Sequence, residues 1–306
     1  MSILKQLRNY TSTFLKWLIK TTSAIKLPGL EGLSLYNLWK IYSDGIIKGT
    51  FSTRASSIAY SFFMALFPFI IFVFNLIPYI DIADFKIKFL ILVDILLPTE
   101  AQGYFGEIFN DIVSRQRGGL LSLSFFLSIF LMTNGVNAIF TGFEFSYHTK
   151  VNRSIIKQYL VALGVSLFLV VILLIAVGII VYSQYAIEGL LGENPFSNYI
   201  DKASVITYIS FIALIYTVVA ILYYFGTKEA KQSRFFSVGA FFTTILILVS
   251  SFLFGLYIEN FSNYNELYGS IGALLILMVY IWLNSNILLL GFELNASLVK
   301  LKENFE

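Results

Sequence analysis

Six long apolar segments restrict the fold of this 306-residue chain more than any other feature of its sequence. At about 1.5 Å per helical residue, each segment is long enough to cross a hydrocarbon core of about 30 Å. The sequence therefore predicts an all-α polytopic membrane protein with six transmembrane helices. The expected spans lie at about 57–79, 120–143, 155–182, 205–225, 235–258 and 271–298.

Composition narrows the chemistry available to the chain. Charged residues make up 13% of it, against about 25% in a typical soluble domain, and 58% of its residues are hydrophobic. The sequence has no cysteine and a single histidine, His148. Disulfides, thiolate metal sites and histidine-rich metal clusters are thereby excluded. We expect no metal and no cofactor.

The distribution of basic residues predicts the orientation. An even number of spans places both termini on one side of the membrane. Of the 21 Lys and Arg residues, 16 lie on that side: 8 in 1–54, 3 in 144–157, 3 in 226–234 and 2 in the carboxyl-terminal tail. Because cytoplasmic loops are enriched in Lys and Arg, the sequence predicts cytoplasmic amino and carboxyl termini.

The regions outside the spans are also patterned. Residues 1–50 are expected to form cytoplasmic or interfacial amphipathic helices, since leucines recur there at helical spacing among basic residues. The alternative is an ordinary cytoplasmic helix that packs on the bundle, which explains the same pattern. Residues 51–300 form the expected transmembrane domain, and 301–306 form a short cytoplasmic tail. Within that domain, 81–118 is expected to be a non-cytoplasmic interfacial or re-entrant segment.

Polar residues within the spans indicate which helix faces meet protein or water, because such groups are costly in lipid. In the last span, Asn286, Glu293 and Ser297 share one face, whereas Gly291 and Asn295 lie on nearly the opposite face. A helix that is polar on two sides is expected to be surrounded by protein. Gly291 permits close approach of a neighbouring helix.

Two other spans carry polar stripes at helical spacing. In the second span the stripe is formed by Asn134, Asn137, Thr141, Glu144 and His148, and it leads toward the cytoplasm. In the first span the corresponding face is formed by Arg54, Ser57, Ser61, Ala65, Pro68, Phe72 and Asn75. Arg54 lies at the amino end of its helix, where the helix dipole also favours an anion.

These stripes allow two interpretations. They line a cytoplasm-facing vestibule between the first, second and last spans, or they are hydrogen bonds and ion pairs that only lock the bundle. On the first interpretation the substrate-binding candidates are Arg54, Ser57, Ser61, Asn134, Asn137 and Asn286. The candidates for gating or proton coupling are Glu144, His148, Glu293 and Asn295.

Three blocks carry a resemblance to a known family: RASSIAYSFFMALFPFIIF (54–72), NGVNAIFTGFEFSYHTKVNRSIIKQYLVAL (134–163) and YGSIGALLILMVYIWLNSNILLLGFELNASL (268–298). They resemble the YihY/virulence factor BrkB family over roughly residues 35–300. The resemblance implies a bacterial inner-membrane protein with six spans. Some members are linked to serum resistance or export of lipopolysaccharide precursors, and the old ribonuclease BN label is generally considered a misassignment.

The sequence disfavours several functions. A nuclease needs metal-binding carboxylates and histidines near a basic cleft, but the sequence has one histidine and no HxHxDH-like cluster. An ATP-driven pump needs a phosphate-binding loop, and no GxxxxGK(S/T) motif occurs. We therefore expect no enzymatic activity and no nucleic-acid partner. Our hypothesis is a transporter or flippase-like protein whose partners are membrane lipids and an anionic small molecule or lipid precursor. The alternative is a noncatalytic membrane scaffold in envelope assembly. The sequence leaves the oligomeric state open.

Overall fold

A computed structural model of the chain describes residues 36, 40, 43, 50–79, 117–146, 153–191, 198–227, 235–260 and 270–303. Regular structure in these residues is entirely helical, which confirms the predicted all-α class. The elements are α3 (Phe51–Leu76), the short 3-10 helix η1 (Ile77–Tyr79), α6 (Gly118–Glu144), α7 (Ile155–Leu191), α8 (Asn198–Gly226), α9 (Val238–Asn260) and α11 (Ser270–Glu303).

The described residues contain six helices that are long and apolar enough to cross a membrane, as the sequence predicts. The helices extend beyond the apolar segments at several ends. For example, α3 begins at Phe51, and α11 continues to Glu303 past the last apolar residues. Polar residues such as Arg54 and Lys300 continue a helix without penalty, so hydropathy alone places these ends too far inward.

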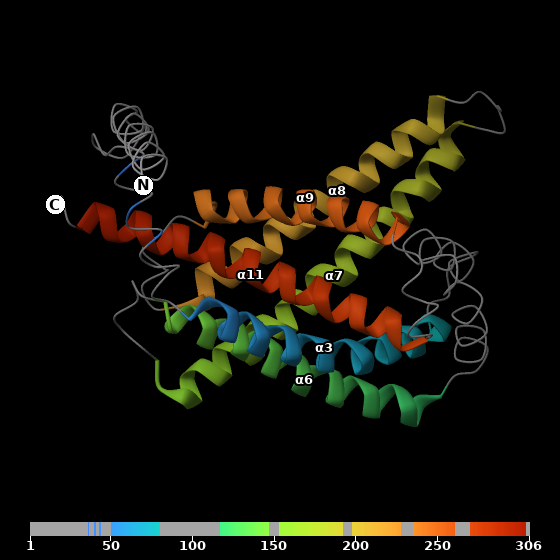
Figure 1. The fold of residues 1–306 in the computed structure, drawn as a ribbon. Helices are drawn as coiled ribbons and strands as arrows, with labels where there is room; N and C mark the ends of the chain where they lie inside the picture. Colours follow the sequence, from blue (N-terminus) through green and yellow to red (C-terminus); the bar gives the residue numbers. More distant parts are fainter. Residues whose placement is uncertain are drawn as a thin grey trace.

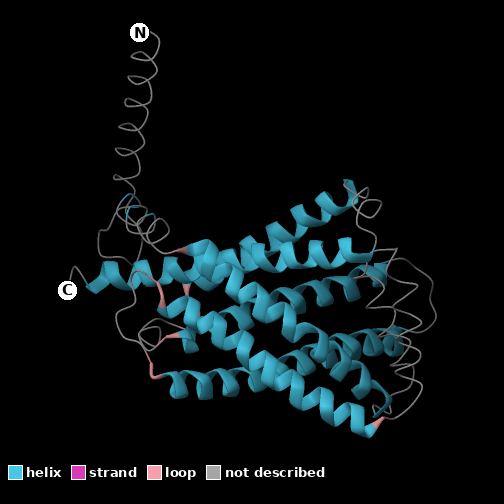
Figure 2. Cartoon of the chain, turned by 60° about the horizontal axis from the view of Figure 1, so that its bottom comes forward, coloured by secondary structure: helices cyan, strands magenta, loops and turns pink. Residues whose placement is uncertain are grey.

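The six helices alternate in direction and pack in chain order (Figure 1). Each helix contacts the next one, and α11 packs against α3, which closes the arrangement into a ring. Figure 2, turned by 60° from that view, shows the same helix bundle. At one end, α3, α7 and α9 begin and α6, α8 and α11 end; we call this the Arg54 end.

Several sequence predictions fall on residues that the structure does not describe. The described residues leave out nearly all of 1–50, the expected amphipathic helices, and nearly all of 81–118, the expected interfacial or re-entrant segment. Both therefore stay predictions. So does the placement of the Arg54 end on the cytoplasmic side, which follows from the basic residues alone.

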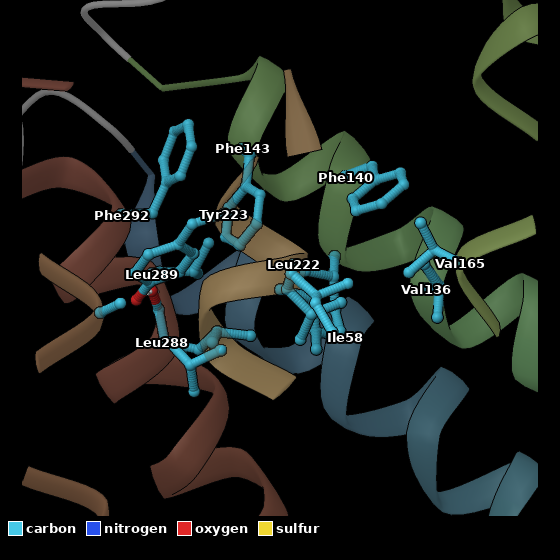
Figure 3. Close-up of a cluster of buried hydrophobic side chains, with 14 of the residues drawn as sticks. Ile58, Val136, Phe140, Phe143, Val165, Leu222, Tyr223, Leu288, Leu289 and Phe292 are labelled. Carbon is cyan, nitrogen blue, oxygen red and sulfur yellow. Dashed lines mark hydrogen bonds between the residues drawn. The ribbon is translucent and has the colours of Figure 1, made fainter. Parts of the chain in front are cut away.

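An aromatic core joins three helices near the Arg54 end (Figure 3). Phe143 of α6 stacks on Phe292 of α11 with ring centroids 4.1 Å apart and an interplanar angle of 8°. Tyr223 of α8 meets both rings edge-on, at 5.5 Å and 5.9 Å. All three side chains are almost fully buried, so this core fixes the positions of the polar groups that surround it.

A close crossing of α9 and α11 lies beside this core. A side chain at Gly291 would overlap the hydroxyl groups of Thr243 and Tyr223, and one at Gly239 would overlap the Gly291 carbonyl. Tyr223 donates a hydrogen bond to the Leu288 carbonyl at 2.7 Å and lies 2.6 Å from the Thr243 hydroxyl. The two glycines thus allow backbone contact, which confirms the close neighbour expected at Gly291.

Candidate functional site

Arg54 is buried in the first turns of α3, with only 7% of its surface exposed. Its Nη1 donates a hydrogen bond of 2.7 Å to the carbonyl of Gly142 on α6. The guanidinium lies over the Phe51 ring, 4.7 Å from the centroid. The other two nitrogens, Nε and Nη2, are buried and have no hydrogen-bond partner among the described residues. A charged group in this position retains unused capacity to bind an anion.

Glu293 faces the same region from α11 and is fully buried. The hydroxyl of Ser146, just beyond the end of α6, donates a hydrogen bond of 2.7 Å to Glu293 Oε2. The Glu293 carboxylate lies near enough to Arg54 for its negative charge to act on the guanidinium. We refer to Arg54, Ser146 and Glu293 as the charge cluster; it joins α3, α6 and α11 at the Arg54 end.

Two neighbouring features belong to this cluster's surroundings. Ser297, four residues after Glu293 on the same face of α11, is fully buried, and its hydroxyl has no partner among the described residues. Thr50 precedes α3 in the left-handed region, with φ of 45°, and makes no side-chain cap. A β-branched residue in that conformation is strained by roughly 1–2 kcal/mol. The positive end of the α3 dipole adds to the charge of Arg54.

Glu144 belongs to a different contact. Its Oε1 accepts a hydrogen bond of 3.1 Å from the backbone N–H of Arg153, just before α7. The Arg153 side chain donates at 2.6 Å to the carbonyl of Phe225 at the end of α8. Burial lowers the pKa of the Arg153 guanidinium, and the nearby Glu144 carboxylate acts in the opposite direction. Arg153 stays charged at neutral pH, so these groups fasten α6, α7 and α8 together.

The polar stripe of α6 faces α7. Gln158 donates to Glu144 Oε2 at 2.8 Å, and its amide oxygen lies 2.9 Å from the Thr141 hydroxyl. The hydroxyl of Tyr159 donates to Asn134 Oδ1 at 3.2 Å. The Gln158 amide oxygen also lies 3.2 Å from the side-chain amide of Asn137. Asn134, Asn137 and Glu144 therefore form a seam with α7 and do not face Arg54.

The remaining predicted site residues are dispersed. Asn295 accepts from the Gly239 N–H and donates to the Ser237 hydroxyl, both at 2.8 Å, so it caps the start of α9. Asn286 donates to the Trp282 carbonyl of its own helix. Ser57 is exposed on the outer surface of α3, and Ser61 is half-buried. His148 lies outside the described residues.

The structure thus brings together two of the predicted candidates, Arg54 and Glu293, from helices far apart in the chain. Sequence reasoning missed Ser146, Gln158 and Tyr159 as partners. Gln158 was detectable as an amide within an apolar segment, but nothing in the sequence links Ser146 to Glu293. In the described part of the chain, no three acidic or histidine side chains gather as a metal site would require.

The fold and this buried cluster define a class: a multi-pass membrane protein in which six helices enclose two buried side chains of opposite charge near one end. The family model for virulence factor BrkB matches residues 44–305, and the chain belongs to that family. This confirms the resemblance found in the sequence, and with it a multi-pass protein of a bacterial inner membrane.

Three relatives illustrate the similarity. YfkH of Bacillus subtilis, which carries a ribonuclease-like name, is 28% identical over 82% of this chain and 91% of its own length. A UPF0761 membrane protein of Glaesserella parasuis is 25% identical over 63% of this chain and 65% of its own. A UPF0761 membrane protein of Alteromonas mediterranea is 34% identical over 28% of this chain and 29% of its own. No solved structure matches the chain.

Proposed function

We propose that this protein moves an anionic solute or an anionic lipid or envelope precursor across or within the membrane, as a transporter or flippase-like protein, without catalysing a reaction. The observation that carries the proposal is the pair of buried, unpartnered nitrogens on Arg54. Leaving buried donors unsatisfied costs about 1–3 kcal/mol, and more for charged groups. A ligand that supplies anionic acceptors recovers this free energy, so the site favours an anion.

In this proposal Glu293 acts as the internal counter-charge of Arg54. When no ligand is bound, its carboxylate balances the guanidinium of Arg54 inside the bundle, and Ser146 fixes its orientation. A buried charge without such compensation is strongly destabilising. When a ligand anion binds Arg54, the ligand neutralises the guanidinium in place of Glu293. The attraction that holds α11 to α3 and α6 is then weaker. Glu293 thereby links ligand binding at Arg54 to opening of the helix bundle.

The hydrogen bonds between helices suggest which parts would move together. The α9–α11 pair is joined by Asn295 at one end and by the Ser251 and Tyr280 hydroxyls, 2.6 Å apart, farther along. The α6–α7 pair is joined by the seam around Gln158. We propose that α9 and α11 separate as one unit from α3, α6 and α7, exposing Arg54 at its end of the bundle. Packed interfaces of this kind switch between discrete arrangements.

Reconstitution into liposomes tests this proposal. Two probes are followed: radiolabelled inorganic phosphate, and a fluorescent phosphatidylglycerol whose movement between leaflets is read by quenching. We expect the wild type to move at least one probe, and Arg54→Ala and Glu293→Gln to slow it at least about tenfold, because each removes one buried charge of the charge cluster. Ser122→Ala, an exposed hydroxyl bonded only to its own helix, is the matched control and should match the wild type.

Protein that remains folded in each variant, judged by a single size-exclusion peak, is a condition of the comparison. Equal rates in wild type, Arg54→Ala and Glu293→Gln would show that the charge cluster has no part in transport. The absence of movement for both probes in folded wild type would favour the second candidate function.

That second candidate is a noncatalytic membrane scaffold in envelope assembly. It is favoured by one specific observation: the side chains of Asn134, Glu144 and Asn295 form hydrogen bonds with residues in or next to neighbouring helices. Such contacts lock a bundle and need no ligand. The scaffold accounts for these residues, but it offers no reason for the unpartnered nitrogens of Arg54.

A further inference from the structure

The unpartnered side of Arg54 carries two donors in a fixed relation. Nη1 points to the Gly142 carbonyl, so Nε and Nη2 remain. In a planar guanidinium, Nε and Nη2 lie along the same edge, opposite the side taken by Nη1. That edge presents two nearly parallel N–H bonds, which match the spacing of two oxygens of one carboxylate or phosphate group. A monatomic anion offers no second acceptor atom for this edge.

Burial determines how a ligand can reach this edge. Both nitrogens are covered by protein, and the negative charge of Glu293 on α11 acts on the guanidinium without a hydrogen bond to either nitrogen. A ligand therefore binds there only after the covering side chains part. The same opening removes Arg54 from the influence of Glu293, so ligand and carboxylate compete for one cation.

We propose that Arg54 binds an oxyanion side-on through Nε and Nη2, in exchange for its interaction with Glu293. The ligand class is thus a molecule bearing a phosphate or carboxylate group, either free or as part of a lipid headgroup. This inference specifies the substrate class of the proposed transport function and rests on that function for its biological use. The binding step itself can be measured without transport.

The test uses the full chain in neutral detergent and inorganic phosphate as the probe, with chloride at equal ionic strength as reference. Binding is read as a rise in melting temperature with phosphate concentration. For wild type we expect phosphate, but not chloride, to raise the melting temperature in a saturable way. In Arg54→Lys the half-saturating concentration should rise at least about tenfold, because an ammonium keeps the charge but lacks the two-donor edge.

Two variants sharpen the result. Glu293→Gln replaces the competing carboxylate with a neutral amide of the same shape, so phosphate should bind roughly tenfold more tightly. Arg153→Lys changes another arginine at the same end, one whose side chain bonds the Phe225 carbonyl, and should bind phosphate as the wild type does. If Arg54→Lys does not fold, the comparison of Glu293→Gln with wild type decides the proposal.

A parallel titration distinguishes the two sources of the oxyanion. Micelles containing phosphatidic acid present the phosphate on a lipid, and phosphatidylcholine micelles are the reference. Stabilisation by inorganic phosphate alone indicates a soluble ligand, and stabilisation by phosphatidic acid alone indicates a lipid; both support oxyanion binding.

Three results would overturn the inference: equal stabilisation by phosphate and chloride, an unchanged half-saturation in Arg54→Lys, or weaker binding in Glu293→Gln. Failure here is separable from failure of the transport proposal. Phosphate binding that depends on Arg54, without movement of any probe in liposomes, leaves this inference standing and removes transport. If the Arg54→Lys variant transports as fast as the wild type, transport stands and oxyanion binding at Arg54 is removed.

Discussion

Gly291→Ala is expected to destabilise the folded protein by about 3 kcal/mol or more. The added methyl group overlaps the hydroxyls of Thr243 and Tyr223, and the Gly239 carbonyl lies 3.0 Å away. Overpacking of this kind usually costs about 1–3 kcal/mol, and here relief requires breaking the bonds that Tyr223 makes to Thr243 and to the Leu288 carbonyl. Chemical denaturation in mixed micelles measures the change in the free energy of unfolding.

Gly255→Ala is the matched control for this prediction. Gly255 lies on α9, but a Cβ there meets nothing within 4 Å. The same exchange should therefore be neutral or slightly stabilising, since alanine has the higher helix propensity. Equal stabilities of the two variants would mean that α9 and α11 do not cross at Gly291 as the structure has them.

Neutralising Arg54 or Glu293 should cost about 3–5 kcal/mol, because the charge that remains buried loses a nearby opposite charge. Glu293→Gln preserves the shape of the side chain and an acceptor for Ser146, so the loss reports the missing charge. Arg54→Gln removes the cation and leaves the buried carboxylate. In the double variant both charges are absent, and we expect much of the stability to return.

The double-mutant cycle, measured by the same denaturation, gives the coupling between the two residues. We expect a coupling of about 1–3 kcal/mol, within the usual range for groups that belong to one network of charges and hydrogen bonds. Glu144→Gln combined with Arg54→Gln serves as the reference cycle, because Glu144 contacts Arg153 and Gln158 instead. Additive effects for Arg54 and Glu293 would exclude their pairing in the folded state.

Much of the helical framework is predictable from the sequence, because the apolar segments are long and lipid admits few alternatives. The two polar faces of the last span were also informative. Glu293 faces α3 and α6, while Gly291 and Asn295 face α9, as expected for a helix surrounded by protein. Helical periodicity alone is sufficient to infer that the last helix contacts protein on both of its polar faces.

The composition of the site was less predictable. A polar stripe specifies a face of its own helix but not the helix that covers it. The sequence predicts a vestibule at Asn134, Asn137 and Glu144, and the structure places α7 there. The proximity of Arg54 and Glu293 depends on packing of the first helix against the last. No local pattern encodes such a contact, and Ser146 lies beyond its helix, where periodicity gives no direction.

On the proposed function, the buried region around Arg54 and Glu293 opens to admit an anion. The chain lacks cysteine, so Ser297→Cys introduces a single thiol next to the charge cluster, at a fully buried position. The measurement is the rate at which a membrane-impermeant thiol reagent modifies it in proteoliposomes, with and without phosphate. Exposed Ser154→Cys and buried Ala162→Cys set the fast and slow limits. We predict an intermediate rate that changes when phosphate is added; a thiol as inert as that of Ala162→Cys under both conditions would contradict the account.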